Sequence, residues 1–217
     1  MSFINRIRTS RIIFRLVYIL SPVLNIFSPR YSRAANSARR REAGMPGTLI
    51  NGQRREPLNS LPYGAYTMGY NGCEVIAAYN LLCLVGREEP LADIADWFEG
   101  RALLLNGWGG TNIGSMRRFL RQRGLEFKAL GPGRRGEYDA AFGKNGAGVL
   151  SFWTGQRVKN EKGRWNTLHT VAVKKTDRGV LVFNHRGLDT DAAEYTSLVE
   201  YISENGLLPV VFFALRD

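Results

Sequence analysis

The hydrophobic pattern of this 217-residue chain changes its period near Gly146, and this change restricts the folds that the chain can adopt. Before Gly146 the apolar residues recur every three or four positions, which indicates helices. After it they recur every second position, which indicates strands. Helices that precede a set of strands are typical of an α+β fold. The length favours one domain, with or without an appended segment.

The helical half contains one segment with almost no polar face. The stretch NGCEVIAAYNLLCLV at 71–85 carries apolar side chains around most of its circumference, so we predict a largely buried helix there. Two more helices are expected at 90–98 and 113–123. The second of these contains MRRFLRQR. We expect Met116, with Phe119 or Leu120, to point inward and the arginines to point outward.

The second half contains four segments rich in Val and Phe, which predict strands. They are AGVLSFW, LHTVAVKK, GVLVFNH and PVVFFAL, at 147–153, 168–175, 179–185 and 209–215. Asp177 to Gly179 should form a tight turn between the second and third strands, and a short helix is expected at 197–204. We therefore expect a helix-rich N-terminal part packed on a C-terminal antiparallel sheet.

The net charge of +11 is concentrated near the N-terminus. Residues 1–45 contain nine arginines and a single glutamate, whereas the rest of the chain carries a surplus of only +3. A surplus of that size is ordinary for a folded domain, which argues against nucleic acid as a partner.

The apolar run at 12–27 is interrupted by an arginine, a serine, a proline and an asparagine, so it is too short and too broken to span a bilayer. We expect residues 1–45 to form a basic and apolar segment that binds an anionic membrane surface as an interfacial helix. A signal or anchor sequence, a helix packed on the domain and a poorly ordered tail are the alternatives. Residues 46–60 are interpreted as a linker, and residues 61–217 as the folded domain.

The chain has two cysteines, Cys73 and Cys83. On one helix their separation corresponds to about 15 Å, whereas a disulfide needs Cα atoms closer than about 7 Å. Two free thiols suit a reducing compartment. We therefore expect a cytoplasmic protein that is peripheral at the membrane.

Cys73 stands at the start of the predicted buried helix. Asn71 is a suitable N-cap and Glu74 completes a capping box, which places Cys73 in the first turn. There the unpaired main-chain N–H groups and the helix dipole favour a thiolate. The alternative is that Cys73 is a small buried apolar residue, the role that we assign to Cys83.

Two histidines are present, and His169 is the stronger candidate for a general base. It shares one strand face with Val171 and Val173, where a structural role is the alternative. The predicted hairpin brings Asn184 beside His169, so that its amide could fix the imidazole tautomer. His185 is the other possible base, but it and Asn184 should point to opposite faces.

The segments YNGCEVIAAYNLL, GWGGTN, LHTVAVKK and VFNH, in this order, resemble the papain-like cysteine peptidases, above all the bacterial branch of bacteriocin-leader-processing peptidases and their stand-alone relatives. The resemblance covers roughly residues 60–217. It implies a papain-like fold with Cys73 as nucleophile, His169 as base and Asn184 as the residue that orients the base. It also implies a peptide or protein substrate and neither a metal nor an organic cofactor.

The chain departs from this family pattern before the cysteine. Relatives carry a glutamine there whose amide helps to bind the oxyanion, and residues 63–71 contain none. The N–H of Cys73 could supply one donor and the Asn71 amide the second. Trp108 in GWGGTN could form a wall of the substrate site, although this segment could also be a turn that caps the third helix. Glu74 stands where many relatives have glycine.

The sequence thus favours a cysteine-dependent hydrolase, most simply a peptidase, that forms a thioester on Cys73. The same residues would serve an amide transferase or a deamidase. An alternative function from another class is that of an inactive relative that binds a peptide or a membrane surface. The missing glutamine supports this alternative.

Overall fold

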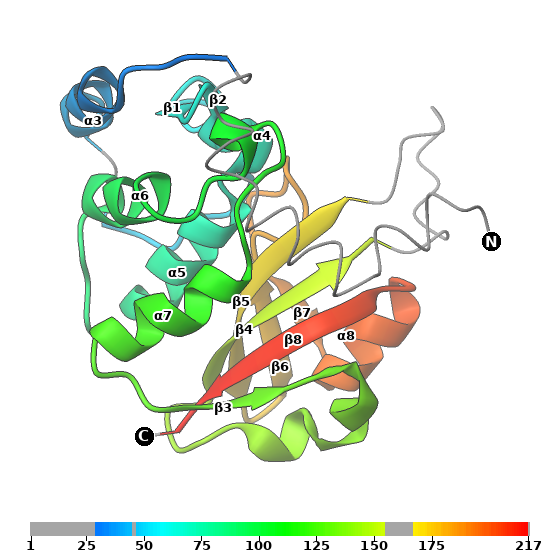
Figure 1. The fold of residues 1–217 in the computed structure, drawn as a ribbon. Helices are drawn as coiled ribbons and strands as arrows, with labels where there is room; N and C mark the ends of the chain where they lie inside the picture. Colours follow the sequence, from blue (N-terminus) through cyan, green and yellow to red (C-terminus); the bar gives the residue numbers. More distant parts are fainter. Residues whose placement is uncertain (1–28, 45–46, 155–166, 217) are drawn as a thin grey trace.

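The computed structural model describes residues 29–44, 47–154 and 167–216. Its centre is a six-stranded antiparallel sheet with the strand order β3-β8-β4-β5-β6-β7 (Figure 1). The strands are β3 (Phe127–Leu130), β4 (Ala147–Trp153), β5 (Leu168–Thr176), β6 (Gly179–Phe183), β7 (Ala193–Tyr195) and β8 (Leu208–Leu215). A separate small hairpin pairs β1 (Pro62–Tyr63) with β2 (Tyr66–Thr67).

Most of the helices precede the sheet in the chain. The α-helices are α3 (Arg33–Glu42), α4 (Met68–Asn71), α5 (Cys73–Leu84), α6 (Leu91–Glu99), α7 (Gly114–Gln122) and α8 (Leu198–Glu204). Three short 3₁₀ helices are η2 (Leu105–Gly107), η3 (Pro132–Glu137) and η4 (Asp139–Ala141). The α+β class and the antiparallel sheet are therefore confirmed.

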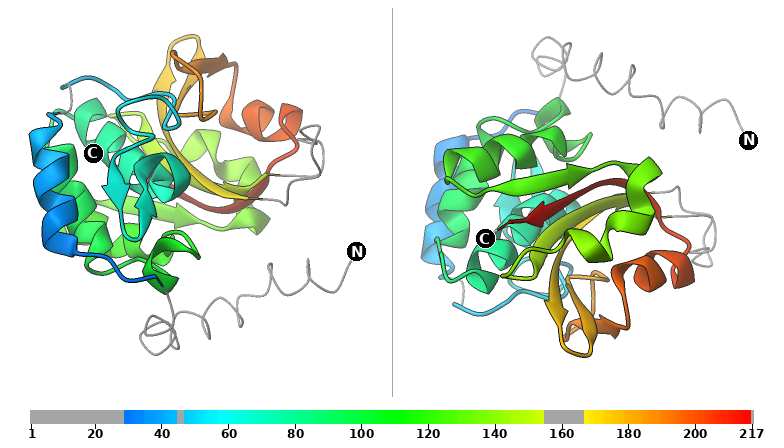
Figure 2. Two further views of the ribbon diagram at one scale, coloured as in Figure 1. Left: turned by 90° about the horizontal axis from the view of Figure 1, so that it is seen from above. Right: turned by 90° about the horizontal axis from the view of Figure 1, so that it is seen from below.

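The sheet separates two hydrophobic clusters, because side chains alternate between its faces. On β4, Val149 belongs to the cluster of α5, α6 and α7, whereas Leu150 and Phe152 belong to the cluster that contains Tyr201 of α8. Figure 2 shows α8 apart from the larger group of helices, with the sheet between them. Helix α5 is buried over most of its length, as its nearly uniform apolar sequence predicts.

The folded domain begins before Leu61, the boundary that we predicted. We expected a linker at 46–60, but Ile50 and Leu58 are buried in the core beside α5. Helix α3, within the basic and apolar segment predicted at 1–45, also packs on the domain. The fully buried Arg40 guanidinium donates to Glu99 at 2.5 Å and to Asp96 at 2.6 Å, both on α6. The folded part therefore includes residues well before Leu61.

Helix α3 escaped prediction because it has no apolar stripe. Its sequence RAANSARRRE buries only Asn36 and Arg40, one turn apart, and both contact Glu99 through hydrogen bonds. A helix anchored by polar groups has no hydrophobic period to detect. The apolar run at 12–27 lies outside the described residues. Within the described ranges, no helix has the length and apolarity needed to cross a bilayer.

Candidate active site

Cys73 is the first residue of α5, close to its predicted place in the first turn. The residue is partly exposed, unlike the nine buried residues that follow it from 74 to 82. The expected capping box is wrong, because the N-cap is Gly72 and no side chain caps the helix. Asn71 instead ends the preceding helix, α4. The nucleophile candidate is thus placed by a break between two consecutive helices.

Asn71 anchors the glycine-rich segment beside the cysteine. Its buried side-chain Nδ2 donates to the main-chain oxygen of Gly107 at 2.9 Å, while Oδ1 is buried without a hydrogen-bond partner. Gly107 has a φ of 104° and is packed so closely on the Asn71 amide that a Cβ would come within 2.6 Å of Nδ2. The Asn71 amide therefore holds η2, a use that competes with the oxyanion role considered from the sequence.

Trp108 follows η2 and is the most exposed aromatic side chain near this end of α5, with 64% of its surface accessible. Tyr70 is 58% exposed and stacks on Tyr66 with ring centroids 5.0 Å apart. Gly107 lies between Asn71 and this aromatic pair, since a Cβ at position 107 would contact both Asn71 and Tyr66. Trp108 is thus free to contact a bound molecule, which leaves its predicted role as a substrate wall open to test.

The Cys73 thiol is uncharged at neutral pH. Burial, and after it the Glu74 carboxylate, raises the pKa of Cys73 to about 11, although main-chain hydrogen bonds from Thr170, Glu74 and Cys73 itself act in the opposite direction. Burial also raises the pKa of Glu74 well above its usual range. The helix N-terminus alone therefore does not produce the thiolate that the sequence suggested.

His169 lies near the start of β5, and one ring nitrogen is fixed. Its Nε2 lies 2.8 Å from the main-chain oxygen of Asn184. Because a carbonyl oxygen only accepts, Nε2 carries the hydrogen, and Nδ1 of the neutral ring keeps its lone pair. Burial lowers the pKa of His169 below its ordinary value, which keeps the ring neutral near pH 7. His169 is therefore in the state that a general base requires.

Cys73 and His169 meet at the same stretch of β5. The sulfur receives a main-chain hydrogen bond from Thr170, the residue that follows His169. The Thr170 side chain lies on the face covered by α5, whereas His169 pairs with Phe152 on the other face. Among the described residues, no hydrogen bond joins the sulfur to the imidazole, and the close approach of the two groups stays a prediction.

Asn184 lies beside His169 as predicted, but through a different group. It has a φ of 59°, which ends β6 at Phe183, two residues earlier than expected. Its side chain turns away from the imidazole to Gln53, whose side-chain Oε1 accepts from Nδ2 at 2.9 Å and whose main-chain N–H donates to Oδ1 at 3.1 Å. The main-chain carbonyl of Asn184, not its amide, orients His169.

Gln53 is a site residue that sequence reasoning missed. It is 6% exposed, and its Nε2 donates to the main-chain oxygen of Gly69 in α4 at 3.2 Å. Gly69 is packed closely on Gln53, since a Cβ at position 69 would lie 3.0 Å from the main-chain oxygen of Gln53. Gln53 precedes Cys73 by twenty positions, so no local spacing could have linked the two.

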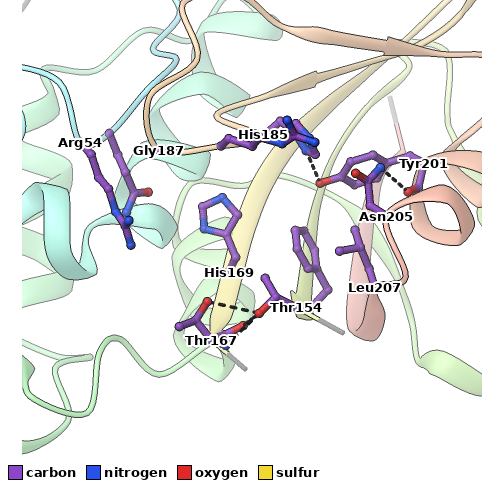
Figure 3. Close-up of a pocket in the computed structure, with 12 residues that line it drawn as sticks. Arg54, Thr154, Thr167, His169, His185, Gly187, Tyr201, Asn205 and Leu207 are labelled. Atoms are coloured by element: carbon purple, nitrogen blue, oxygen red, sulfur yellow. Dashed lines mark hydrogen bonds between the residues drawn. The ribbon is translucent and has the colours of Figure 1, made fainter. Parts of the chain in front are cut away.

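A pocket of about 260 Å³ opens beside His169 on the α8 side of the sheet. Figure 3 shows the His169 ring between Arg54 on one side and His185 with Tyr201 on the other. His185 Nδ1 lies 3.0 Å from the Tyr201 hydroxyl, and burial, followed by Arg186, lowers its pKa to about 4. His185 is thus a neutral pocket wall, while Gln53 lines the same pocket.

The described residues contain no group of three or more His, Cys, Asp or Glu side chains placed to hold a metal ion. Comparison of the chain with models of protein families, with curated proteins and with solved structures finds no match. The function must therefore be inferred from the residues around Cys73 and His169.

Proposed function

We propose that this protein is a papain-like cysteine hydrolase, most simply a peptidase, with Cys73 as nucleophile and His169 as general base. The observation that carries the proposal is the position of Cys73, a partly exposed residue at the start of a buried helix. Its sulfur accepts from the main-chain N–H of Thr170, the residue next to His169. The imidazole is neutral, and its Nε2–H is held by Asn184, so Nδ1 is left to accept a proton. This order of elements, from nucleophile helix to base strand to orienting turn, matches the resemblance found in the sequence.

The chemistry follows from these protonation states. Nδ1 of His169 takes the proton from Cys73 as the sulfur attacks the carbonyl carbon of a peptide or amide. The imidazolium then gives this proton to the leaving nitrogen as the carbon–nitrogen bond breaks, and the acyl group stays on the sulfur as a thioester. Water attacks the thioester while His169 again accepts a proton, and the free thiol is restored with release of the acid.

The absence of a hydrogen bond between sulfur and imidazole among the described residues is compatible with this role. Catalytic hydrogen bonds are often long or misaligned without substrate and tighten only in the complex. The main-chain N–H groups at the start of α5 are available to stabilise the oxyanion.

The proposal is tested by the reactivity of the two thiols. Iodoacetamide should label Cys73 faster than Cys83 at pH 7, with each site followed separately by mass spectrometry. The thiol of Cys83 is a suitable internal reference because it is also partly buried and its pKa is also raised by burial. His169→Ala should remove the difference. p-Nitrophenyl acetate should leave a transient acetyl group on Cys73 that the Cys73→Ser variant does not form.

A second candidate is a non-catalytic relative that binds a peptide in the pocket beside His169. It is favoured by the raised pKa of Cys73 and by the absence, among the described residues, of a hydrogen bond between sulfur and imidazole. Equal and slow labelling of Cys73 and Cys83 would support this candidate and contradict the hydrolase. An amide transferase would pass the labelling test, and it would be recognised by transfer of the acetyl group to an added amine in preference to water.

A further inference from the structure

The pocket beside His169 carries two guanidinium groups that the proposed chemistry does not use. Arg54 belongs to the loop before β1, and Arg186 follows the turn at Asn184, so two distant segments bring them to one cavity. Both side chains are exposed. His169 and His185 line the same cavity, and their rings are neutral at pH 7. The lining therefore presents two full positive charges.

Neither guanidinium is paired with an acidic side chain of the described ranges. Among the described residues, Arg54 and Arg186 form no ion pair, whereas several other arginines do, namely Arg40, Arg41, Arg123 and Arg134. The pocket lining contains no Asp or Glu. Asp189 acts on His185 and Tyr201 from outside the lining, without an ion pair to either arginine. Two unpaired cations in one cavity form a site for an anion.

The position of Arg54 is set by its surroundings. Its main-chain N–H donates to the oxygen of Gly187 at 2.7 Å, and its side chain lies across the same glycine. A Cβ at Gly187 would come within 2.8 Å of Arg54 Cδ and Cγ. The absence of a side chain at 187 thus makes room for the arginine at the edge of the pocket, next to His169 (Figure 3).

We propose that this pocket binds a carboxylate group of the substrate, so that the enzyme prefers peptides with an acidic side chain or a free C-terminus close to the bond that it cleaves. This inference rests on the proposed hydrolase function. A guanidinium binds a carboxylate through parallel N–H donors, and its charge does not change within the working pH range. The phenyl ring of Phe152 and the side chain of Leu207 line the same cavity and would contact the methylene groups of such a residue.

The experiment compares three thiol-reactive probes that differ only in charge and its position. N-chloroacetyl-glutamine amide is neutral, N-chloroacetyl-glutamate amide has a side-chain carboxylate, and N-chloroacetyl-glutamine has a free C-terminus. Their rates of reaction with Cys73 are measured at pH 7 in the wild-type protein and in Arg54→Gln, Arg186→Gln and Arg55→Gln. Arg55 is the matched control, because it is an exposed neighbour of Arg54 outside the pocket.

We expect at least one anionic probe to label Cys73 about fivefold faster than the neutral probe, as suits one or two exposed ion pairs. The ratio should fall towards one in Arg54→Gln and Arg186→Gln and at high salt, and should be unchanged in Arg55→Gln. The faster of the two anionic probes identifies the source of the carboxylate. Faster labelling of Cys73 than of Cys83 with no preference for charge would overturn this inference alone. Equal, slow labelling of both thiols by every probe would overturn the hydrolase as well.

Discussion

The main-chain oxygen of Asn184 lies 2.8 Å from Nε2 of His169, and this contact assigns the proton on the imidazole. A side-chain amide could present either its oxygen or its nitrogen to the ring, whereas a carbonyl can only accept. The contact therefore leaves Nδ1 as the basic nitrogen, and this assignment does not depend on the position of the Asn184 side chain. That side chain serves a separate purpose, since it joins the turn to Gln53.

Asn184→Gly tests this division of roles. Glycine keeps the carbonyl and adopts the φ of 59° without strain, so the labelling rate of Cys73 should stay within about threefold of wild type. The loss of the buried contacts to Gln53 should lower the free energy of unfolding by about 1–3 kcal/mol, measured by urea denaturation. Asn184→Ala should be less stable than the glycine variant by about 1 kcal/mol, because a Cβ is strained at positive φ. A loss of labelling rate of a hundredfold or more in Asn184→Gly would show that the amide itself is needed.

Arg40→Ala should destabilise the protein strongly. It would leave Glu99, whose side chain is fully buried, without its cationic partner, and breaking such a pair costs about 3–5 kcal/mol. Arg41→Ala is the matched control: it removes a neighbouring arginine of α3 whose ion pairs with Asp93 and Asp96 are exposed, at a cost of about 1 kcal/mol or less. Thermal and urea denaturation of the two variants measure the difference. Equal stability of the two variants would mean that α3 is not part of the folded domain.

The stability should fall as the pH is lowered from about 6.5 towards 4. The folded-state pKa of His185 is about 4, below the ordinary value of 6.5, so the unfolded chain takes up a proton in this range before the folded protein does. Stability is therefore fully present above pH 6.5 and is progressively lost as the pH falls through this window. Urea midpoints at several pH values should fall less steeply for His185→Gln than for wild type. Parallel curves for the two proteins would contradict a buried, neutral His185.

The elements of this fold were predictable where their signals are local. Helix α5 and strands β4, β5, β6 and β8 have strong apolar periods, and the turn at 177–179 follows from short-range sequence. The position of His169 on β5 and its proximity to Asn184 follow from the same pattern. Strand alternation also placed His169 on the face of Val171 and Val173, which the shared cluster with Phe152 confirms.

The rest of the site depends on contacts that no period encodes. Gln53 reaches Asn184 across 131 positions of sequence, and α3 is held by the buried charge of Arg40. The positive φ of Asn184, which ends β6 one residue before it, is a feature that a strand pattern cannot indicate. The raised pKa of Cys73 likewise arises from tertiary burial that outweighs the local effect of the helix start.

The central claim is that His169 removes the proton from Cys73, and the pH dependence of alkylation tests it most directly. In a Cys83→Ser background, the rate of Cys73 alkylation by iodoacetamide should be nearly constant from about pH 7 to 9. Over this range the thiol, whose pKa is about 11, and the neutral imidazole do not change their protonation states. In His169→Ala the reaction must wait for ionisation of the thiol, so the rate should rise about tenfold per pH unit. The same tenfold rise in both proteins would contradict the claim.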